Sequence, residues 1–93
     1  MISEKQKNII KKITSKYNAK MVGIFGSYAR NEQTNESDLD VLIDFESNIN
    51  LLELIGLEQE LSELLGIKVD LVTVKSVNEK LKSYINTDLI RIV

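Results

Sequence analysis

Acidic and apolar residues alternate between positions 38 and 45, and this alternation constrains the fold more than any other feature of the chain. The apolar members are Leu39, Val41, Ile43 and Phe45, and they alternate with Asp38, Asp40, Leu42 and Asp44. Because successive side chains on a strand point to opposite faces, the run predicts a strand with one apolar face and one face rich in acids. The acidic face is the first place to look for chemistry.

Asp38 and Asp40 would project from the same face of that strand, with Cα atoms roughly 7 Å apart. Two carboxylates at this separation repel each other by about 1 kcal/mol in water, and by more where the effective dielectric is lower. A divalent cation between them reverses the sign of this interaction, so the pair is a candidate Mg²⁺ site. The alternative is that both acids face solvent, or that Ser37 and Asp38 only shape the turn that enters the strand.

A Gly-Ser turn lies ten residues before this pair. The apolar run at residues 21–25 predicts a buried strand that ends at Gly26 and Ser27, and residues 28–30 would then begin a short helix. Backbone N–H groups and a hydroxyl at such a helix start form a general anion-binding arrangement, and glycine lets the backbone approach a phosphate closely. Taken alone, a Gly-Ser turn is more often structural than phosphate-binding.

Asp70 interrupts a second apolar run. We predict a strand over residues 67–74, in which burying an unpaired carboxylate would be costly. If Asp70 faces the same pocket as Asp38 and Asp40, three carboxylates converge in the pattern of a two-metal site. The alternative is an exposed position on an edge strand.

The composition excludes several kinds of chemistry. The chain has 93 residues, 43% of them hydrophobic, which predicts one domain (residues 1–93), and it contains neither cysteine nor histidine. Disulfides, thiolate zinc sites and His-dependent nucleophiles are therefore excluded, and a metal held by oxygen ligands would be Mg²⁺, Mn²⁺ or Ca²⁺. No apolar run approaches the roughly 20 residues of a membrane span, so we expect a cytoplasmic protein with no membrane partner.

Charge is segregated along the chain, although the net charge is only −2. Residues 1–30 carry seven basic and one acidic side chain (+6), residues 31–70 carry one and eleven (−10), and residues 71–93 carry four and two (+2). The acidic middle would repel phosphates unless metal ions intervene, which disfavours direct nucleic-acid binding.

Three further helices and an edge strand complete the predicted fold. An amphipathic helix is predicted over residues 3–17 with Ser3 and Gln6 as a capping box, and another over residues 51–65 between Asn50 as N-cap and Gly66 as C′ residue. A short helix over residues 78–85 and an edge strand over residues 90–93 follow. The fold class is α+β, a small mixed β-sheet with packed helices in the order α-β-α-β-α-β-α.

Gly26 and Ser27, followed after ten residues by Asp38 and Asp40, resemble the signature of the DNA polymerase beta-like nucleotidyltransferase superfamily. Within it, the segments GSYAR (residues 26–30) and SDLDVLI (residues 37–43) are similar to the minimal nucleotidyltransferase (MNT) family, and the resemblance covers nearly the whole chain. Relatives often have glycine where this chain has Asn31, and asparagine can adopt the same backbone conformation.

The resemblance implies a polymerase beta-like fold and a nucleotidyl transfer, in which a hydroxyl attacks the α-phosphorus of ATP and pyrophosphate leaves. It implies two Mg²⁺ ions bound by three catalytic acids, and a triphosphate bound at the Gly-Ser turn. The acids would be Asp38, Asp40 and Asp70, and the nucleotide-binding residues Gly26, Ser27 and Arg30. For Arg30, a plain surface position on the short helix is the alternative.

The resemblance also implies a protein partner. MNT proteins are typically encoded beside HEPN-domain proteins, which implies an antitoxin that transfers AMP to a tyrosine of its HEPN ribonuclease toxin. The second long helix and the C-terminal segment are the candidate docking surfaces. Two alternatives stay open: a non-catalytic antitoxin that neutralises the toxin by binding, and a small-molecule (aminoglycoside-type) nucleotidyltransferase, which the lack of a second domain for an acceptor pocket disfavours.

Overall fold

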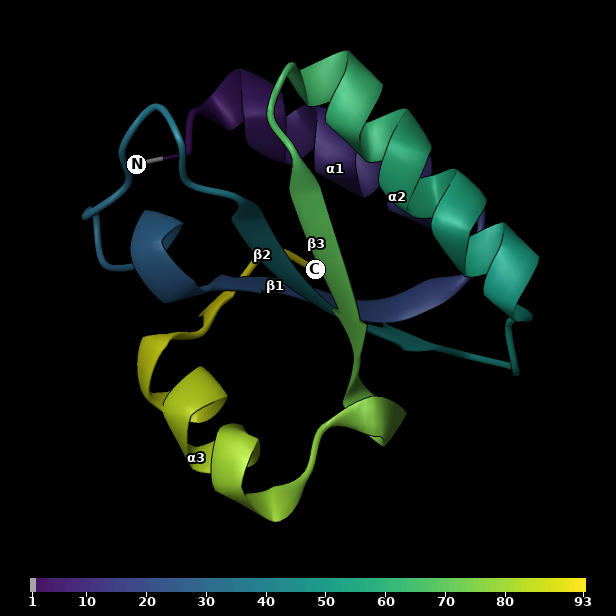
Figure 1. Cartoon of the computed structure of the whole chain (residues 1–93). Helices are drawn as coiled ribbons and strands as arrows, with labels where there is room; N and C mark the ends of the chain where they lie inside the picture. The colour runs from purple at the N-terminus through teal and green to yellow at the C-terminus, as the bar shows by residue number, and fades with distance from the viewer. Residues whose placement is uncertain (1) are drawn as a thin grey trace.

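A four-stranded mixed sheet with helices on both faces forms the molecule (Figure 1). The computed structural model describes residues 2–93. The strands are β1 (Ala19–Phe25), β2 (Leu39–Phe45), β3 (Val69–Thr73) and β4 (Ile90–Arg91), and the α-helices are α1 (Glu4–Ser15), α2 (Leu51–Leu65) and α3 (Glu79–Asp88). Two 3₁₀ turns, η1 (Gly26–Tyr28) and η2 (Val74–Ser76), follow β1 and β3.

The strand order is β3-β2-β1-β4. The central strands β1 and β2 are antiparallel, β3 runs parallel to β2, and the two-residue β4 pairs antiparallel with β1 at the other edge. The register sets Asp40 between Phe25 on β1 and Asp70 on β3. The predicted α+β class, with a mixed sheet and packed helices, is confirmed.

The hydrophobic core lies between the sheet and the pair formed by α1 and α2. The odd-numbered apolar positions of β2 are buried there, as the alternation predicts, against residues such as Ile10 of α1 and Leu57 and Leu61 of α2. An ion pair between Lys16 and Glu60, 2.9 Å from Nζ to Oε2, joins the two helices at the surface.

The predicted helix caps are present. The Ser3 side chain accepts a hydrogen bond from the Gln6 N–H and the Gln6 side chain accepts one from the Ser3 N–H, which completes the capping box. The Asn50 side chain accepts from the Glu53 N–H at the start of α2, and Gly66 ends that helix with a left-handed φ of 67°. These caps satisfy backbone groups that have no partner inside the helix.

Several predicted boundaries were wrong by a few residues. The first helix ends at Ser15 rather than residue 17, because the backbone turns through a positive φ at Asn18 and lets β1 begin at Ala19. The helix after the Gly-Ser turn is the single turn η1, which starts at Gly26 itself. The third helix extends to Asp88, beyond the predicted residue 85.

Two side chains of α2 bind the outer edge of β3. The Ser62 hydroxyl accepts the N–H of Val69 at 2.9 Å, and the Glu58 carboxylate accepts the N–H of Leu71 at 2.8 Å. Because β3 is an edge strand, these N–H groups point away from β2 and would otherwise lack an acceptor in the protein.

The other face of the sheet is only partly covered. Helix α3 packs there, on the side opposite α1 and α2 (Figure 1), with Ile85 buried and Leu89 close against Gly23 of β1. Asp40 of β2 and Asp70 of β3 lie on this face too, where they line a cavity together with residues of α3. Among residues 2–93, the longest helices are too short or too polar to cross a bilayer.

Candidate active site

A cavity of about 330 Å³ lies between the acidic face of the sheet and α3. Its polar lining comes from Arg30, which follows η1, from Asp40 and Asp70 on neighbouring strands, and from Asp88 at the end of α3. Gly26 contributes backbone, and the exposed ring of Tyr84 contributes an apolar wall. Two of the three predicted acids, together with Gly26 and Arg30, therefore share one cavity.

Asp40 and Asp70 are direct neighbours because they occupy the same register position on the parallel strands β2 and β3. Neither carboxylate has a hydrogen-bond or ion-pair partner among residues 2–93. Burial raises the pKa of the Asp40 carboxyl above its usual value, and the charges of Asp70 and Asp38 raise it further, whereas Arg30 lowers it. The pair is therefore electrostatically strained in the absence of a cation.

Gly26 is needed at its position for two reasons. Its φ of +77° belongs to the left-handed region, which other residues adopt only at a cost. A Cβ built on Gly26 would also collide with the carboxylate of Asp40. The glycine of the Gly-Ser turn thus makes room for a predicted metal ligand, a role that sequence reasoning assigned only to a phosphate.

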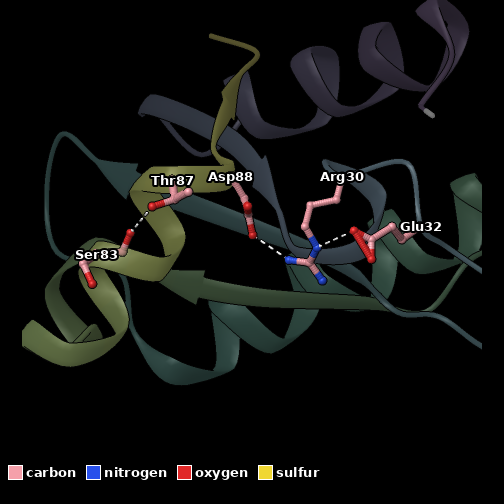
Figure 2. A network of polar contacts seen from close by, with 5 residues as sticks. All are labelled: Arg30, Glu32, Ser83, Thr87 and Asp88. Carbon is pink, nitrogen blue, oxygen red and sulfur yellow. Dashed lines mark hydrogen bonds and ion pairs between the residues drawn. The ribbon is translucent and has the colours of Figure 1, made fainter.

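Arg30 is held between two carboxylates (Figure 2). Its Nη1 donates to Asp88 Oδ2 at 2.6 Å, and its Nε donates to Glu32 Oε1 at 3.2 Å. The hydrogen bond that Arg30 donates to Asp88 is the main cause that raises the pKa of Arg30. The remaining nitrogen, Nη2, points away from both carboxylates (Figure 2) and carries two N–H donors with no acceptor among residues 2–93.

Asp38 and Ser27 lie beside this cavity rather than in it. Asp38 precedes β2 and lines a neighbouring hollow with Tyr28 and Lys68, and its Oδ2 is 3.9 Å from Lys68 Nζ. Ser27 follows Gly26 within η1, whose first turn has no side-chain cap. No cluster of three acidic residues suited to a metal ion forms within residues 2–93, so the expected convergence of Asp38 with Asp40 and Asp70 is not reached in this structure.

Sequence reasoning missed Asp88 and Tyr84, the residues that α3 adds to the cavity. Asp88 is the last residue of α3, where the helix dipole disfavours a negative charge. Tyr84 is 74% exposed although it is a large aromatic side chain. The position of Asp88 at the helix end and the exposure of Tyr84 could be recognised as unusual only after the extent of α3 was known.

The donor set of the cavity fits Mg²⁺. Three carboxylates and one guanidinium line it, which leaves two negative charges to attract cations. The unpartnered carboxylate oxygens of Asp40 and Asp70 are the hard ligands that Mg²⁺ prefers. A triphosphate could enter this cavity only together with cations that neutralise the acids.

Comparisons with known proteins show the family to which the chain belongs. A family model described as a nucleotidyltransferase domain matches residues 5–93. A protein of Methanocaldococcus jannaschii, provisionally named a protein adenylyltransferase, is 55% identical over 83 residues, 88% of this chain and 85% of its own length. The protein adenylyltransferase MntA of Thermococcus cleftensis is 45% identical over 62 residues, 67% of this chain and 63% of its own.

A solved structure of a toxin–antitoxin with AMP-PNP has a chain that superposes with a TM-score of 0.85 at 25% identity. The match covers 94% of this chain and 72% of that one. The resemblance drawn from the Gly-Ser and Asp-x-Asp motifs is thereby confirmed. Since the family model spans nearly all of the sequence, this chain belongs to the nucleotidyltransferase domain family and is a nucleotidyltransferase.

Proposed function

We propose that this chain is a Mg²⁺-dependent protein adenylyltransferase that acts as an antitoxin. Its substrates would be ATP and a tyrosine hydroxyl of a HEPN ribonuclease toxin, which the added AMP inactivates. The observation that carries the proposal is the pair of unpartnered carboxylates, Asp40 and Asp70, set side by side in a cavity with Gly26 and Arg30. Related proteins named protein adenylyltransferases, and the toxin–antitoxin structure with AMP-PNP, support it.

The residues in and beside the cavity have distinct tasks in this proposal. Asp40 and Asp70 would hold Mg²⁺, and Asp70, the more exposed of the two, would also serve as the carboxylate base that takes the proton of the attacking hydroxyl. Bound Mg²⁺ would supply charge neutralisation of the triphosphate. Gly26 and Ser27 offer backbone N–H groups to phosphate, and the free Nη2 of Arg30 donates to a phosphate oxygen.

Asp38 remains a predicted metal ligand. Its ion pair with Lys68 is long and lies in solvent, so little free energy is lost when the carboxylate leaves that partner. Its charge already acts on Asp40, whose pKa it helps to raise. We therefore expect Asp38 to bind the ion together with Asp40 when nucleotide is present.

The decisive experiment is intact-mass spectrometry of a purified HEPN-domain partner, incubated with this chain, ATP and Mg²⁺. We expect the partner to gain the mass of one or more AMP units, on a tyrosine located by peptide mapping. The double variant Asp38→Ala with Asp40→Ala should lose transfer by more than about 100-fold, because metal binding and nucleotide alignment fail together.

Asp44→Ala is the matched control for this double variant. Asp44 lies on the same strand and the same face as Asp40, but it pairs with Lys20 at 3.5 Å and lies outside the cavity. Transfer by the control should stay within about twofold of the wild-type rate. Full transfer by the double variant, or no transfer by the wild type with any HEPN partner, would contradict the proposal.

Neutralisation by binding alone is the second candidate. Apolar side chains on the outer face of α2 support it, since Leu51 and Leu52 are 69% and 81% exposed. Such a surface at one end of a helix fits a protein partner better than solvent. In that case the double variant, although unable to transfer AMP, would still suppress the toxin when the two are co-expressed.

A further inference from the structure

Arg30 is the one cationic side chain that lines the cavity within residues 2–93, and it shares the cavity with three carboxylates. A guanidinium forms strong two-pronged bonds with any carboxylate that it can reach. Arg30 is close enough to Asp40 to lower the pKa of that carboxyl. The side chain is nevertheless bonded to Asp88 and Glu32 (Figure 2), and within residues 2–93 it forms no ion pair with Asp40 or Asp70.

Asp88 is the stronger of the two partners that hold Arg30. The distance to Asp88 is 2.6 Å and that to Glu32 is 3.2 Å, and the Asp88 side chain is 19% exposed whereas that of Glu32 is 64% exposed. A short and shielded ion pair survives competition with water better than a long and solvated one. The position of the Arg30 side chain is therefore fixed mainly by its ion pair with Asp88.

At its location Asp88 does not stabilise the helix to which it belongs. It is the last residue of α3, where the negative end of the helix dipole repels a carboxylate. The neighbouring Thr87 turns back to bond the Ser83 carbonyl oxygen in the same turn (Figure 2), whereas Asp88 reaches across the cavity to Arg30. An acid in this unfavourable place indicates a role at Arg30.

We propose that Asp88 is a positioning residue that holds Arg30 away from Asp40 and Asp70. Without Asp88, the guanidinium would swing onto these carboxylates and occupy the oxygens that a divalent cation needs. With Asp88 in place, both acids stay free for the ion and Nη2 stays free for a phosphate. The inference rests on the proposed metal-binding role of Asp40 and Asp70.

Binding of Mn²⁺, followed by electron paramagnetic resonance in the presence of AMP-PNP, tests this role without catalysis. Asp88→Asn keeps the shape of the side chain but removes its charge, and should weaken Mn²⁺ binding about tenfold. Asp88→Glu should restore most of the affinity. Glu32→Gln, which removes the other charge from Arg30, is the control and should change the affinity less than about twofold.

A double-mutant cycle separates this role from simple loss of a negative charge. In an Arg30→Gln background nothing can swing onto the acids, so adding Asp88→Asn should leave Mn²⁺ affinity unchanged. An equal loss in both backgrounds, or no loss in either, would overturn the inference. Absence of Mn²⁺ binding by the wild type is a different failure, because it contradicts the proposed metal site itself.

A crystal structure of the Asp88→Asn variant gives a readout that needs no metal. The Arg30 guanidinium should then lie within ion-pair distance of Asp40 or Asp70. Arg30 still held in its present place by Glu32 alone would also overturn the inference. Thermal unfolding of each variant establishes that the sheet and α3 remain folded.

Discussion

Asp40 illustrates how a single residue can serve binding at the expense of folding. Its carboxyl has a raised pKa because it is half-buried and faces two other carboxylates. A folded-state pKa above the unfolded value means that the folded chain binds the proton more tightly. The contribution of Asp40 to the free energy of unfolding is therefore fully present below the unfolded pKa of 3.8 and is lost as the pH rises through the folded pKa.

Asp40→Asn should consequently stabilise the metal-free protein. Thermal unfolding in EDTA should show a gain that is near zero at pH 3 and grows to at most about 1 kcal/mol at pH 7, since solvent screens a half-buried site. Asp44→Asn, on the same strand, removes a paired carboxylate and should give no such gain. A constant difference between pH 3 and pH 7 would show that charge on Asp40 is not the cause.

Gly26 offers a second residue-scale prediction. Gly26→Ala should destabilise the protein by more than about 1 kcal/mol, because the positive φ and the collision with Asp40 add together. Gly66→Ala has a similar φ of +67° but open space around its Cβ, so it isolates the backbone cost of about 1 kcal/mol. Gly56→Ala, within α2 and also unobstructed, should stabilise by up to about 1 kcal/mol. Urea unfolding of the three variants measures these differences, and equal losses at positions 26 and 66 would contradict the collision.

At the scale of elements, α2 secures β3 through side chains rather than through backbone pairing. Ser62→Ala should lower the free energy of unfolding by about 1 kcal/mol, because the Val69 N–H loses its acceptor. Glu58→Ala should lower the free energy of unfolding by a similar amount, because the Leu71 N–H loses its acceptor. Glu58→Gln keeps an acceptor oxygen and should lower it less. Hydrogen exchange of these two amides gives the measurement. Unchanged protection of both amides in the alanine variants would refute the assignment.

Features of the elements that depend on neighbouring residues could be predicted from the sequence, whereas features that depend on distant contacts could not. Caps and alternation are local patterns, so the ends of α2 and the buried face of β2 were predicted correctly from neighbouring residues. The register of β3 against β2, which sets Asp70 beside Asp40, depends on contacts between residues about thirty positions apart. From the sequence we could therefore state only what would follow if Asp70 faced the same pocket as Asp40. No local sequence pattern predicts with which carboxylate a long side chain such as Arg30 forms its ion pair.

For the whole molecule, the segregated charge of the sequence becomes a division between layers. The lysine-rich α1 and the glutamate-rich α2 lie side by side, and the ion pair between Lys16 and Glu60 joins them, so side chains of opposite charge meet on the helical face. Asp40 and Asp70, which have no ion pair within residues 2–93, lie on the opposite face of the sheet, in the cavity that α3 helps to line. This arrangement was not evident from the running charge, because helix packing decides which charges meet.

The bonds from Ser62 and Glu58 to β3 also limit how another protein can attach to this one. Many partners dock by adding a strand to an exposed sheet edge, where free N–H groups serve as a template. Here the outward N–H groups of Val69 and Leu71 are already taken, and the opposite edge is β4, only two residues long. A protein that docks on this one is therefore expected to contact side chains rather than to extend the sheet, so docking would leave the strands that align Asp40 and Asp70 in place.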